Sequence, residues 1–334
     1  MQGNASASYA GIGGLGSQIW PRTGPEIISR DTLKGLRARS NGPGFFRLAF
    51  HLSALALGAL AVYLASGNLW LQIPAMFGYG VVIVLLFAPL HECSHGTAFH
   101  SRWINHTVGF TVAAFTMRPF LYFKYRHAAH HTYTQHEDHD PDIVPFPTSL
   151  RDYFSQILGL SFWPKLLGTL WRGSTGRFTE EEREFLPQSV FKSVMLEIRL
   201  LCLFYVAVAA VSIYFGSAIA LIYWLLPRIM GEPVLRAIRM AEHTGAEESP
   251  NLLANTRTTL ANPVLRMLYW NMPFHAEHHL ASSVPFHALG RLHKEVSPHL
   301  ECVSKSYIQV HRDIIREVLG YSKPTASSAQ EAGR

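Results

Sequence analysis

The chain has 334 residues, of which 48% are hydrophobic and only 16% are charged, and its mean hydropathy is +0.10. This composition is too apolar for an ordinary soluble domain of this length and favours a multi-pass membrane protein. The formal net charge of +6 does not require a nucleic acid partner, because basic residues on the cytoplasmic side of a membrane protein account for it.

Residues 1–43 are predicted to form a cytosolic N-terminal region. The first 20 residues contain neither Lys nor Arg and no continuous apolar stretch, so they lack the features of a secretory signal. Their Gly, Ala and Ser content predicts a disordered tail. Residues 44–320 are predicted to form the membrane domain, and residues 321–334 a flexible C-terminal tail.

Four apolar segments are predicted to span a membrane as two helical hairpins, at residues 45–64, 69–90, 198–215 and 217–230. A span needs about 20 apolar residues, and the fourth segment is the shortest. The connections within the hairpins carry no charge, whereas basic residues collect before the first hairpin and between the two hairpins. The positive-inside rule therefore predicts that both termini and the long middle region face the cytoplasm.

Two further apolar stretches lie in the middle region, at residues 103–123 and 153–171. Polar and charged residues such as Arg118 and Lys165 interrupt them, so both are predicted to be interfacial or re-entrant helices that do not cross. This prediction matters because, if just one of the two stretches crossed the membrane, the third histidine cluster would lie on the opposite side of the membrane from the first.

Three histidine clusters follow the apolar segments. They are His91 and His95; His127, His130 and His131; and His275, His278 and His279. Residues three and four apart lie on one face of a helix, so each cluster is expected to converge on a single point. Under the predicted topology, all eight imidazoles lie on the cytoplasmic side of the membrane.

The number of imidazoles predicts more than one metal ion. Imidazole binds Zn, Cu, Fe and Ni, so the ligand type alone does not identify the metal. A zinc ion is satisfied by about four ligands, so eight histidines indicate two metal ions. Two adjacent metals with mostly nitrogen ligands suggest iron that reacts with oxygen.

Two other functions stay open at this point. His91-Glu92-Cys93-Ser94-His95 also matches the zinc-protease pattern H-E-x-x-H, in which Glu92 is the general base of a membrane protease. A transporter can use intramembrane histidines as a proton relay, although such residues lie within the spans. A single zinc site at His91 and His95 would not explain the second and third histidine clusters, which weighs against the protease.

Other features predict structure. Thr179-Glu-Glu-Glu182 matches a capping box, and apolar residues from Tyr307 to Leu319 recur at the spacing of an amphipathic helix. Cys93, Cys202 and Cys302 are too few and too far apart for a disulfide framework or a cysteine metal site. No electron-carrier domain is evident in the chain, so a separate protein is expected to supply electrons.

Some polar residues near the clusters are candidates for orienting the ligands. They are His100, His106, His136, His139, Asp138, Asp140 and Asp142. The remaining histidines have no partner at a suitable spacing and are predicted to be structural. They are His51, His287, His293, His299 and His311.

From about Phe45 to His293 the chain resembles the membrane fatty acid desaturase superfamily, which shares three histidine boxes with membrane acyl hydroxylases, carotenoid hydroxylases and ketolases, and alkane hydroxylases. The three clusters match these boxes. Asp140-Pro141-Asp142 after the second box and the surroundings of the third box also fit. Ala241-Glu242-His243 is similar to a glutamate–histidine pair in sphingolipid-type desaturases.

The resemblance implies an all-α membrane protein in which four spans carry a cytosolic helical cap with a di-iron site. It implies nine histidine ligands, the eight in the boxes and His243, with O2 as co-substrate. In stearoyl-CoA desaturases, an Asn four residues before the corresponding histidine holds an iron-bound water. Here that position is Arg239, which cannot accept a hydrogen bond, so Asn271 is an alternative candidate.

The implied function is fatty acyl desaturation, with hydroxylation or ketolation of a lipid or carotenoid as the main alternative. No catalytic residue beyond the metal ligands is assigned. The expected partners are a lipid or acyl substrate from the membrane and a ferredoxin or cytochrome b5 with its reductase. The expected location is the bacterial inner membrane or the endoplasmic reticulum, with the active site on the cytoplasmic side.

Overall fold

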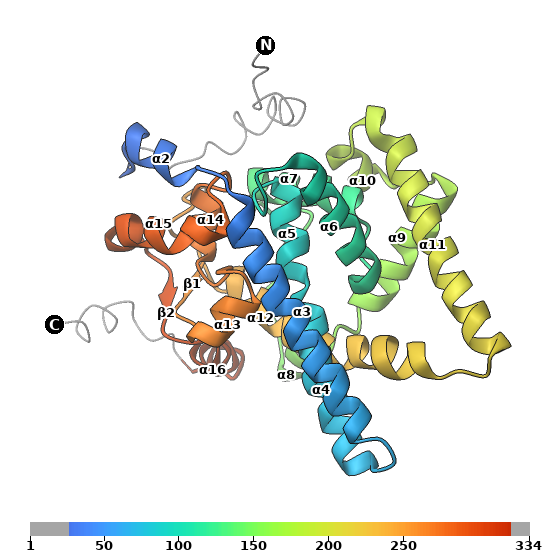
Figure 1. The fold of residues 1–334 in the computed structure, drawn as a ribbon. Helices are drawn as coiled ribbons and strands as arrows, with labels where there is room; N and C mark the ends of the chain where they lie inside the picture. Colours follow the sequence, from blue (N-terminus) through green and yellow to red (C-terminus); the bar gives the residue numbers. More distant parts are fainter. Residues whose placement is uncertain (1–26, 322–334) are drawn as a thin grey trace.

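A computed structural model describes residues 27–321 and shows a mostly helical protein (Figure 1). The predicted disordered N-terminal tail and all but the first residue of the predicted C-terminal tail lie outside the described residues. A short helix, α2 (Arg30–Leu36), comes first in the described range. Cys93, Cys202 and Cys302 are free thiols.

The first predicted hairpin consists of α3 (Asn41–Leu64) and α4 (Leu69–Leu85), which lie side by side, and α4 continues almost without interruption into α5 (Phe87–His95) (Figure 1). Ser40 and Asn68 cap the first turns of α3 and α4 with their side-chain oxygens. The hairpin thus delivers the first histidine cluster to the end of a long apolar helix.

Within residues 27–321, three helices are long and apolar enough to cross a membrane. They are Asn41–Leu64, Leu69–His95 and Gln188–Tyr214, which includes a 3-10 turn (Gln188–Val190) and α11 (Phe191–Tyr214). Large apolar side chains such as Leu57, Trp70 and Ile213 are exposed on them. Apolar surface of this extent is stable in contact with lipid, so these helices indicate a membrane protein.

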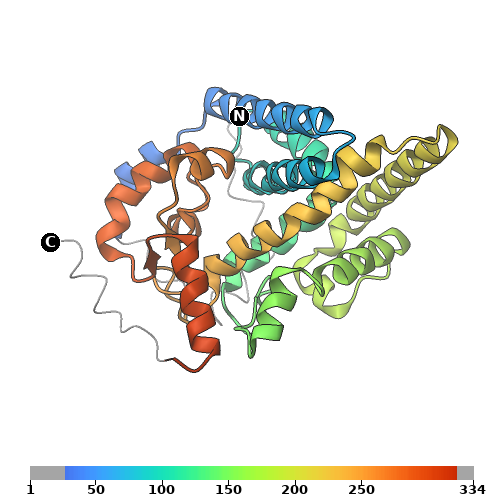
Figure 2. The same ribbon diagram turned by 90° about the horizontal axis from the view of Figure 1, so that it is seen from below.

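The fourth predicted span, 217–230, lies in a longer helix and is not among these three. A π-helical turn (Leu221–Leu225) runs directly into α12 (Leu226–His243), which carries charged side chains along its length. Figure 2 shows α12 passing through the middle of the molecule. Its charges are held inside the protein, as in the fully buried pair of Arg228 and Glu232, 2.5 Å apart.

The crossing of α4 and α12 is unusually close. A Cβ atom at Gly80 on α4 would lie 2.0 Å from the carbonyl oxygen of Pro227, and one at Gly231 on α12 would lie 2.2 Å from the carbonyl oxygen of Gly80. Small residues allow the backbones of membrane helices to touch in this way. Because α4 leads to His91 and α12 ends at His243, the crossing fixes the relative positions of two parts of the site.

The two apolar stretches of the middle region each form two short helices. The first is divided at Met117, whose φ of +60° ends α6 (Arg102–Thr116) before α7 (Phe120–Tyr133) begins. The second forms α8 (Leu150–Ile157) and α9 (Phe162–Thr175). The longest of the four has 15 residues, which is too few to cross a bilayer and agrees with the prediction that neither stretch spans.

The capping box is confirmed. Thr179 accepts a hydrogen bond from the backbone N–H of Glu182, and the Glu182 side chain accepts one from the backbone of Thr179, at the start of α10 (Glu180–Phe185). The predicted amphipathic helix is also confirmed as α16 (Tyr307–Val318), which buries Val310 and Ile314.

The segment between α12 and α16 is folded compactly around the third cluster. It contains α13 (Pro263–Leu268), α14 (His275–Leu280) and α15 (Leu289–Val296), with 3-10 turns at Phe286–Ala288 and Ser297–His299. Two short strands, β1 (Thr258–Thr259) and β2 (Val303–Ser304), pair in parallel and are a small departure from the all-α prediction. Fully buried residues such as Trp270 and Phe286 connect this segment to α5 in the main hydrophobic core.

Candidate metal centre

The nine predicted ligands lie together in the structure as two groups. The first group contains His91, His95, His127, His131 and His278, and the second contains His130, His243, His275 and His279. In each group, one nitrogen from every ring lies within 4.8 Å of the others. All nine side chains are buried or nearly so. The first group therefore has five potential ligands for one metal ion, and the second has four for another.

The expectation that each cluster converges on a single point is wrong for the second and third clusters. His127 and His131 join the first group, whereas His130 joins the second. Successive residues on a helix point about 100° apart, so the side chains of His130 and His131 diverge, while residues four apart stay aligned. The third cluster divides in the same way, with His278 in the first group.

The spacing of the nitrogen atoms is compatible with rings that share a metal ion. The Nε2 atom of His278 lies 2.7 Å from that of His91 and 3.1 Å from that of His131. In the second group, the Nε2 atoms of His243 and His275 are 3.2 Å apart. Two imidazole nitrogens bound to one metal at about 2.1 Å lie about 3.0 Å apart when their bonds form a right angle.

Most of these rings are neutral without a metal. Burial, and then the charges of neighbouring histidines, lower the pKa well below its ordinary value for His127, His131, His243, His275, His278 and His279. A neutral ring keeps the lone pair that a metal requires. The residues present therefore fit two metal ions with imidazole ligands, a donor set that suits iron, zinc, copper and nickel.

Asp140 holds one ring of the second group in place. Its carboxylate accepts a hydrogen bond from Nδ1 of His130 at 2.8 Å, which leaves Nε2 of that ring facing the group. Burial lowers the pKa of His130, but the carboxylates of Asp140 and Asp142 together outweigh this effect and raise that pKa above its ordinary value. Asp140 also accepts from the backbone N–H groups of Gln135 and Asp142, so it both orients a ligand and stabilises the turn.

The other candidate orienting residues are placed elsewhere. Asp138 and His100 are exposed, and Asp142 pairs with Arg126 at 2.9 Å. His106 packs against phenylalanine rings, and Nδ1 of His139 lies 3.8 Å from Glu184. Within residues 27–321, neither these residues nor His136 join the two groups.

Asn271, the alternative candidate for holding an iron-bound water, makes hydrogen bonds within the protein through both polar atoms of its amide. Its amide nitrogen donates to the carbonyl oxygen of Phe286 at 3.0 Å, and its oxygen accepts from Arg47 at 3.4 Å. The φ angles of Trp270 and Asn271, +48° and +59°, are in the left-handed region that non-glycine residues rarely adopt. These contacts support the turn that leads into α14 and so have a structural role.

Two buried glutamates contact the third box, and the sequence analysis gave them no role. Oε2 of Glu242 lies 3.6 Å from Nε2 of His275, and its Oε1 accepts from the hydroxyl of Tyr269 at 3.1 Å. Glu277 accepts from Nδ1 of His293 and from the hydroxyl of Thr258. In the sequence, Glu242 directly precedes His243 and Glu277 lies inside the third box, and these positions could have indicated contacts with the histidines.

The geometry around Glu92 does not support the zinc-protease alternative. Its carboxylate accepts from the hydroxyl of Thr97 at 2.7 Å and from the backbone N–H of Phe286 at 3.3 Å. These contacts tie α5 to the segment after α14. In addition, His91 and His95 share their group with three other histidines, whereas a catalytic zinc takes about three protein ligands in all.

The fold and the site define a helical membrane protein with two buried groups of histidines that could each hold a metal ion. Residues 68–311 match the family model of the fatty acid desaturases, and the chain belongs to this family. Over 276 residues it is 23% identical to an acyl-lipid omega-3 desaturase (cytochrome b5) of the endoplasmic reticulum from Arabidopsis thaliana, covering 73% of this chain and 70% of that protein.

Other relatives match over shorter stretches. The chain is 28% identical over 151 residues to a fatty acid conjugase of Calendula officinalis, covering 42% of this chain and 40% of that protein. It is 30% identical over 101 residues to an sn-1 oleoyl-lipid 12-desaturase of Picosynechococcus sp., covering 30% of this chain and 29% of that protein. The chain thus spans less than half the length of these two relatives.

Proposed function

We propose that the protein is a membrane oxidoreductase that desaturates lipid acyl chains with O2 at a site of two iron ions. The observation that carries this proposal is the convergence of nine buried imidazoles into two groups. Membership of the fatty acid desaturase family supports it, as do the names of the relatives, which are acyl-lipid desaturases and a fatty acid conjugase. The nine histidines are the proposed ligands.

The reaction converts –CH2–CH2– to –CH=CH–. Together with O2, two electrons and two protons, the two hydrogens removed from the acyl chain form two molecules of water. Iron held by the two groups would activate O2, the oxidant, so that hydrogen can be removed from an unactivated CH2. The electrons come from a separate protein, and the Arabidopsis relative is named for one such donor, cytochrome b5.

The protein's own side chains fix and shield the site. Asp140 orients His130, and Phe123 stacks on His127 with ring centroids 5.1 Å apart and an angle of 10° between the planes. Phe87 contacts the rings of both His91 and Phe123. These apolar rings exclude water from one side of the first group, which prevents side reactions during oxidation.

We further propose the four-span topology with the site on the cytoplasmic side, in which the π-helical turn and the start of α12 form the fourth span. The basic residues before α3 and between α7 and α11 support this orientation. A basic cytoplasmic face also attracts an acidic electron donor.

Product analysis tests the function. The protein is expressed in a host with a known lipid profile, and products are measured by mass spectrometry. We expect loss of two hydrogens from acyl chains, and we expect no product from the variants H130A and H278A, which should still insert in the membrane. Gain of oxygen would instead assign hydroxylation or ketolation, and full activity of either variant would remove the assigned site.

A further inference from the structure

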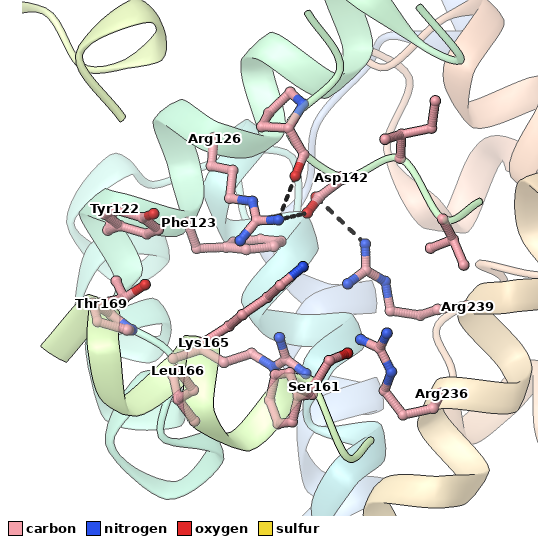
Figure 3. Close-up of a pocket in the computed structure, with 16 residues that line it drawn as sticks. Tyr122, Phe123, Arg126, Asp142, Ser161, Lys165, Leu166, Thr169, Arg236 and Arg239 are labelled. Atoms are coloured by element: carbon pink, nitrogen blue, oxygen red, sulfur yellow. Dashed lines mark hydrogen bonds and ion pairs between the residues drawn. The ribbon is translucent and has the colours of Figure 1, made fainter. Parts of the chain in front are cut away.

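A cavity lined by cationic side chains lies next to the first histidine group. It has a volume of about 150 Å³ and lies between the start of α7, the loop after α7, the start of α9 and the second half of α12. Its charged lining residues are Arg118, Arg126, Lys165, Arg236, Arg239 and a single carboxylate, Asp142. We call it the arginine cavity. Figure 3 shows the side chains of Lys165, Arg236 and Arg239 directed into the same space as Arg126.

The carboxylates present do not balance these cations. Asp142 pairs with both Arg126, at 2.9 Å, and Arg239, at 3.4 Å. Glu232, which is not part of the lining, lies 3.1 Å from Arg118 but is shared with Arg228. Among the residues that the structure describes, Lys165 and Arg236 have no carboxylate within ion-pair distance. The cavity therefore has an excess of positive charge.

Several donors around the cavity also lack an acceptor. The buried Nε–H groups of Arg118, Arg126, Arg236 and Arg239 make no hydrogen bond within the described part of the chain. A buried donor without a partner is costly, and a guanidinium cannot lose its proton to avoid the cost. Burial, followed by the charge of Arg239, lowers the pKa of Arg236, so the surroundings disfavour its cationic form. An anion with several oxygen atoms would satisfy these donors together.

The depth of the guanidinium groups limits the size of that anion. The side chains of Arg118 and Arg239 are only 11% and 15% exposed. A protein surface cannot reach groups at this depth, whereas a phosphate on a flexible molecule can. The cavity has space for a group of that size together with water.

The surroundings of this cavity include the first histidine group on one side and an exposed apolar surface on the other. Phe123 lines the cavity and stacks on His127 of the first group. On the outside, α8, the residue that caps its end and α9 expose the apolar side chains Phe154, Leu158, Leu167 and Trp171. An apolar helix surface beside basic residues is typical of a membrane interface, where anionic headgroups lie.

We propose that the arginine cavity binds the phosphate ester of the acyl substrate, so that the enzyme acts on a phosphate-bearing acyl molecule and not on a neutral lipid. This inference rests on the proposed function and names its substrate class. The phosphate can belong to a phospholipid headgroup or to the coenzyme part of an acyl thioester. Both offer the same oxygen acceptors to the arginines.

Binding to the purified, iron-loaded protein tests the proposal. Affinity is measured by titration calorimetry for dioleoylphosphatidylglycerol, dioleoylglycerol, oleoyl-coenzyme A and oleate. We expect at least one phosphate ester to bind about tenfold or more tightly than dioleoylglycerol and oleate, with an affinity that falls as salt rises. Tighter binding of dioleoylphosphatidylglycerol would identify a phospholipid headgroup as the source of the phosphate, and tighter binding of oleoyl-coenzyme A would identify the coenzyme. Equal affinity for all four molecules would overturn the proposal.

Variants locate the binding to the cavity. R236Q and K165Q should each weaken binding of the phosphate ester by roughly tenfold, with unchanged affinity for dioleoylglycerol and unchanged iron content. R236K should restore part of the loss. R177Q removes an equal charge from an exposed position outside the cavity and should bind as the unmodified protein does. Unchanged binding by K165Q and R236Q would overturn the proposal.

Turnover separates this inference from the proposed function. Desaturation of neutral and phosphate-bearing lipids at equal kcat/KM would remove the inference and leave the desaturase function in place. Tight phosphate binding that depends on Arg236, with no product from any lipid, would overturn the proposed function and leave the anion site.

Discussion

Asp140 and His130 form a buried carboxylate–imidazole pair, with Oδ1 of Asp140 accepting from Nδ1 of His130 at 2.8 Å. The side chains are 1% and 3% exposed, so the pair is dry. Such a pair fixes the ring orientation and the protonated nitrogen, and it makes the other nitrogen a better metal ligand. The contact places a residue outside the three boxes in direct support of the second histidine group.

The D140N variant should lower iron affinity or turnover by about 10- to 100-fold. Both carboxylate oxygens of Asp140 accept hydrogen bonds from backbone N–H groups. In the asparagine variant, the NH2 group would replace one of these oxygens and would face an N–H group that it cannot accept from. Iron per chain and turnover are measured together. The matched control is D138N, at an exposed position two residues away, which should retain both. Equal behaviour of the two variants would contradict the assigned role of Asp140.

The H243A variant should reduce bound iron from about two ions per chain towards one. His243 is one of four residues in the second group, and metal sites with nitrogen ligands need about four. The control is H106A, because His106 packs against phenylalanine rings outside both groups. Iron is counted by plasma mass spectrometry on purified protein. Two full equivalents of iron in H243A would show that His243 is not a ligand.

The G80A variant should lower stability by about 1–3 kcal/mol, because its added carbon overlaps the carbonyl oxygen of Pro227. The control is G78A on the same helix, where an added carbon meets nothing within 4 Å. Thermal unfolding in detergent compares the two variants. A midpoint for G80A equal to that of G78A would show that α4 and α12 can move apart without cost.

The proposed topology predicts that cysteines introduced at Lys34 and Arg177 react with a membrane-impermeant reagent from the same side. A cysteine at Ser66, in the connection between α3 and α4, should react only from the opposite side. All three positions are exposed, and the three native cysteines are replaced first. Labelling of Lys34 and Arg177 from opposite sides would mean that an odd number of segments crosses between them.

The sequence analysis predicted that these nine histidines lie together, but it did not predict how they divide into two groups. His91 and His95 were expected to meet because residues four apart align on a helix, and they do share a group. Helix geometry already requires the side chains of His130 and His131 to diverge, but which other histidines each ring meets depends on the packing of segments distant in sequence. His243 was found only through the resemblance of Ala241-Glu242-His243, since a lone histidine has no periodicity.

The helices could be predicted where a long apolar stretch identifies them, but less well where charged side chains are buried against partners distant in sequence. The helices Asn41–Leu64 and Gln188–Tyr214 follow from their composition. The long course of α12 did not follow, because its charges are compensated by partners distant in sequence, such as Arg118 for Glu232. The arginine cavity depends on four separate segments, so composition alone predicted a basic face but no binding site.

Helix α7 contributes proposed ligands to both histidine groups, with His127 and His131 on one side and His130 on the other. These two sets of rings share one rigid axis and are about 100° apart around it. A small rotation of this helix would bring nitrogen atoms towards one ion while withdrawing them from its neighbour. A mutation that rotates α7 to strengthen the binding of an ion at one proposed metal site would therefore weaken the binding of an ion at the other.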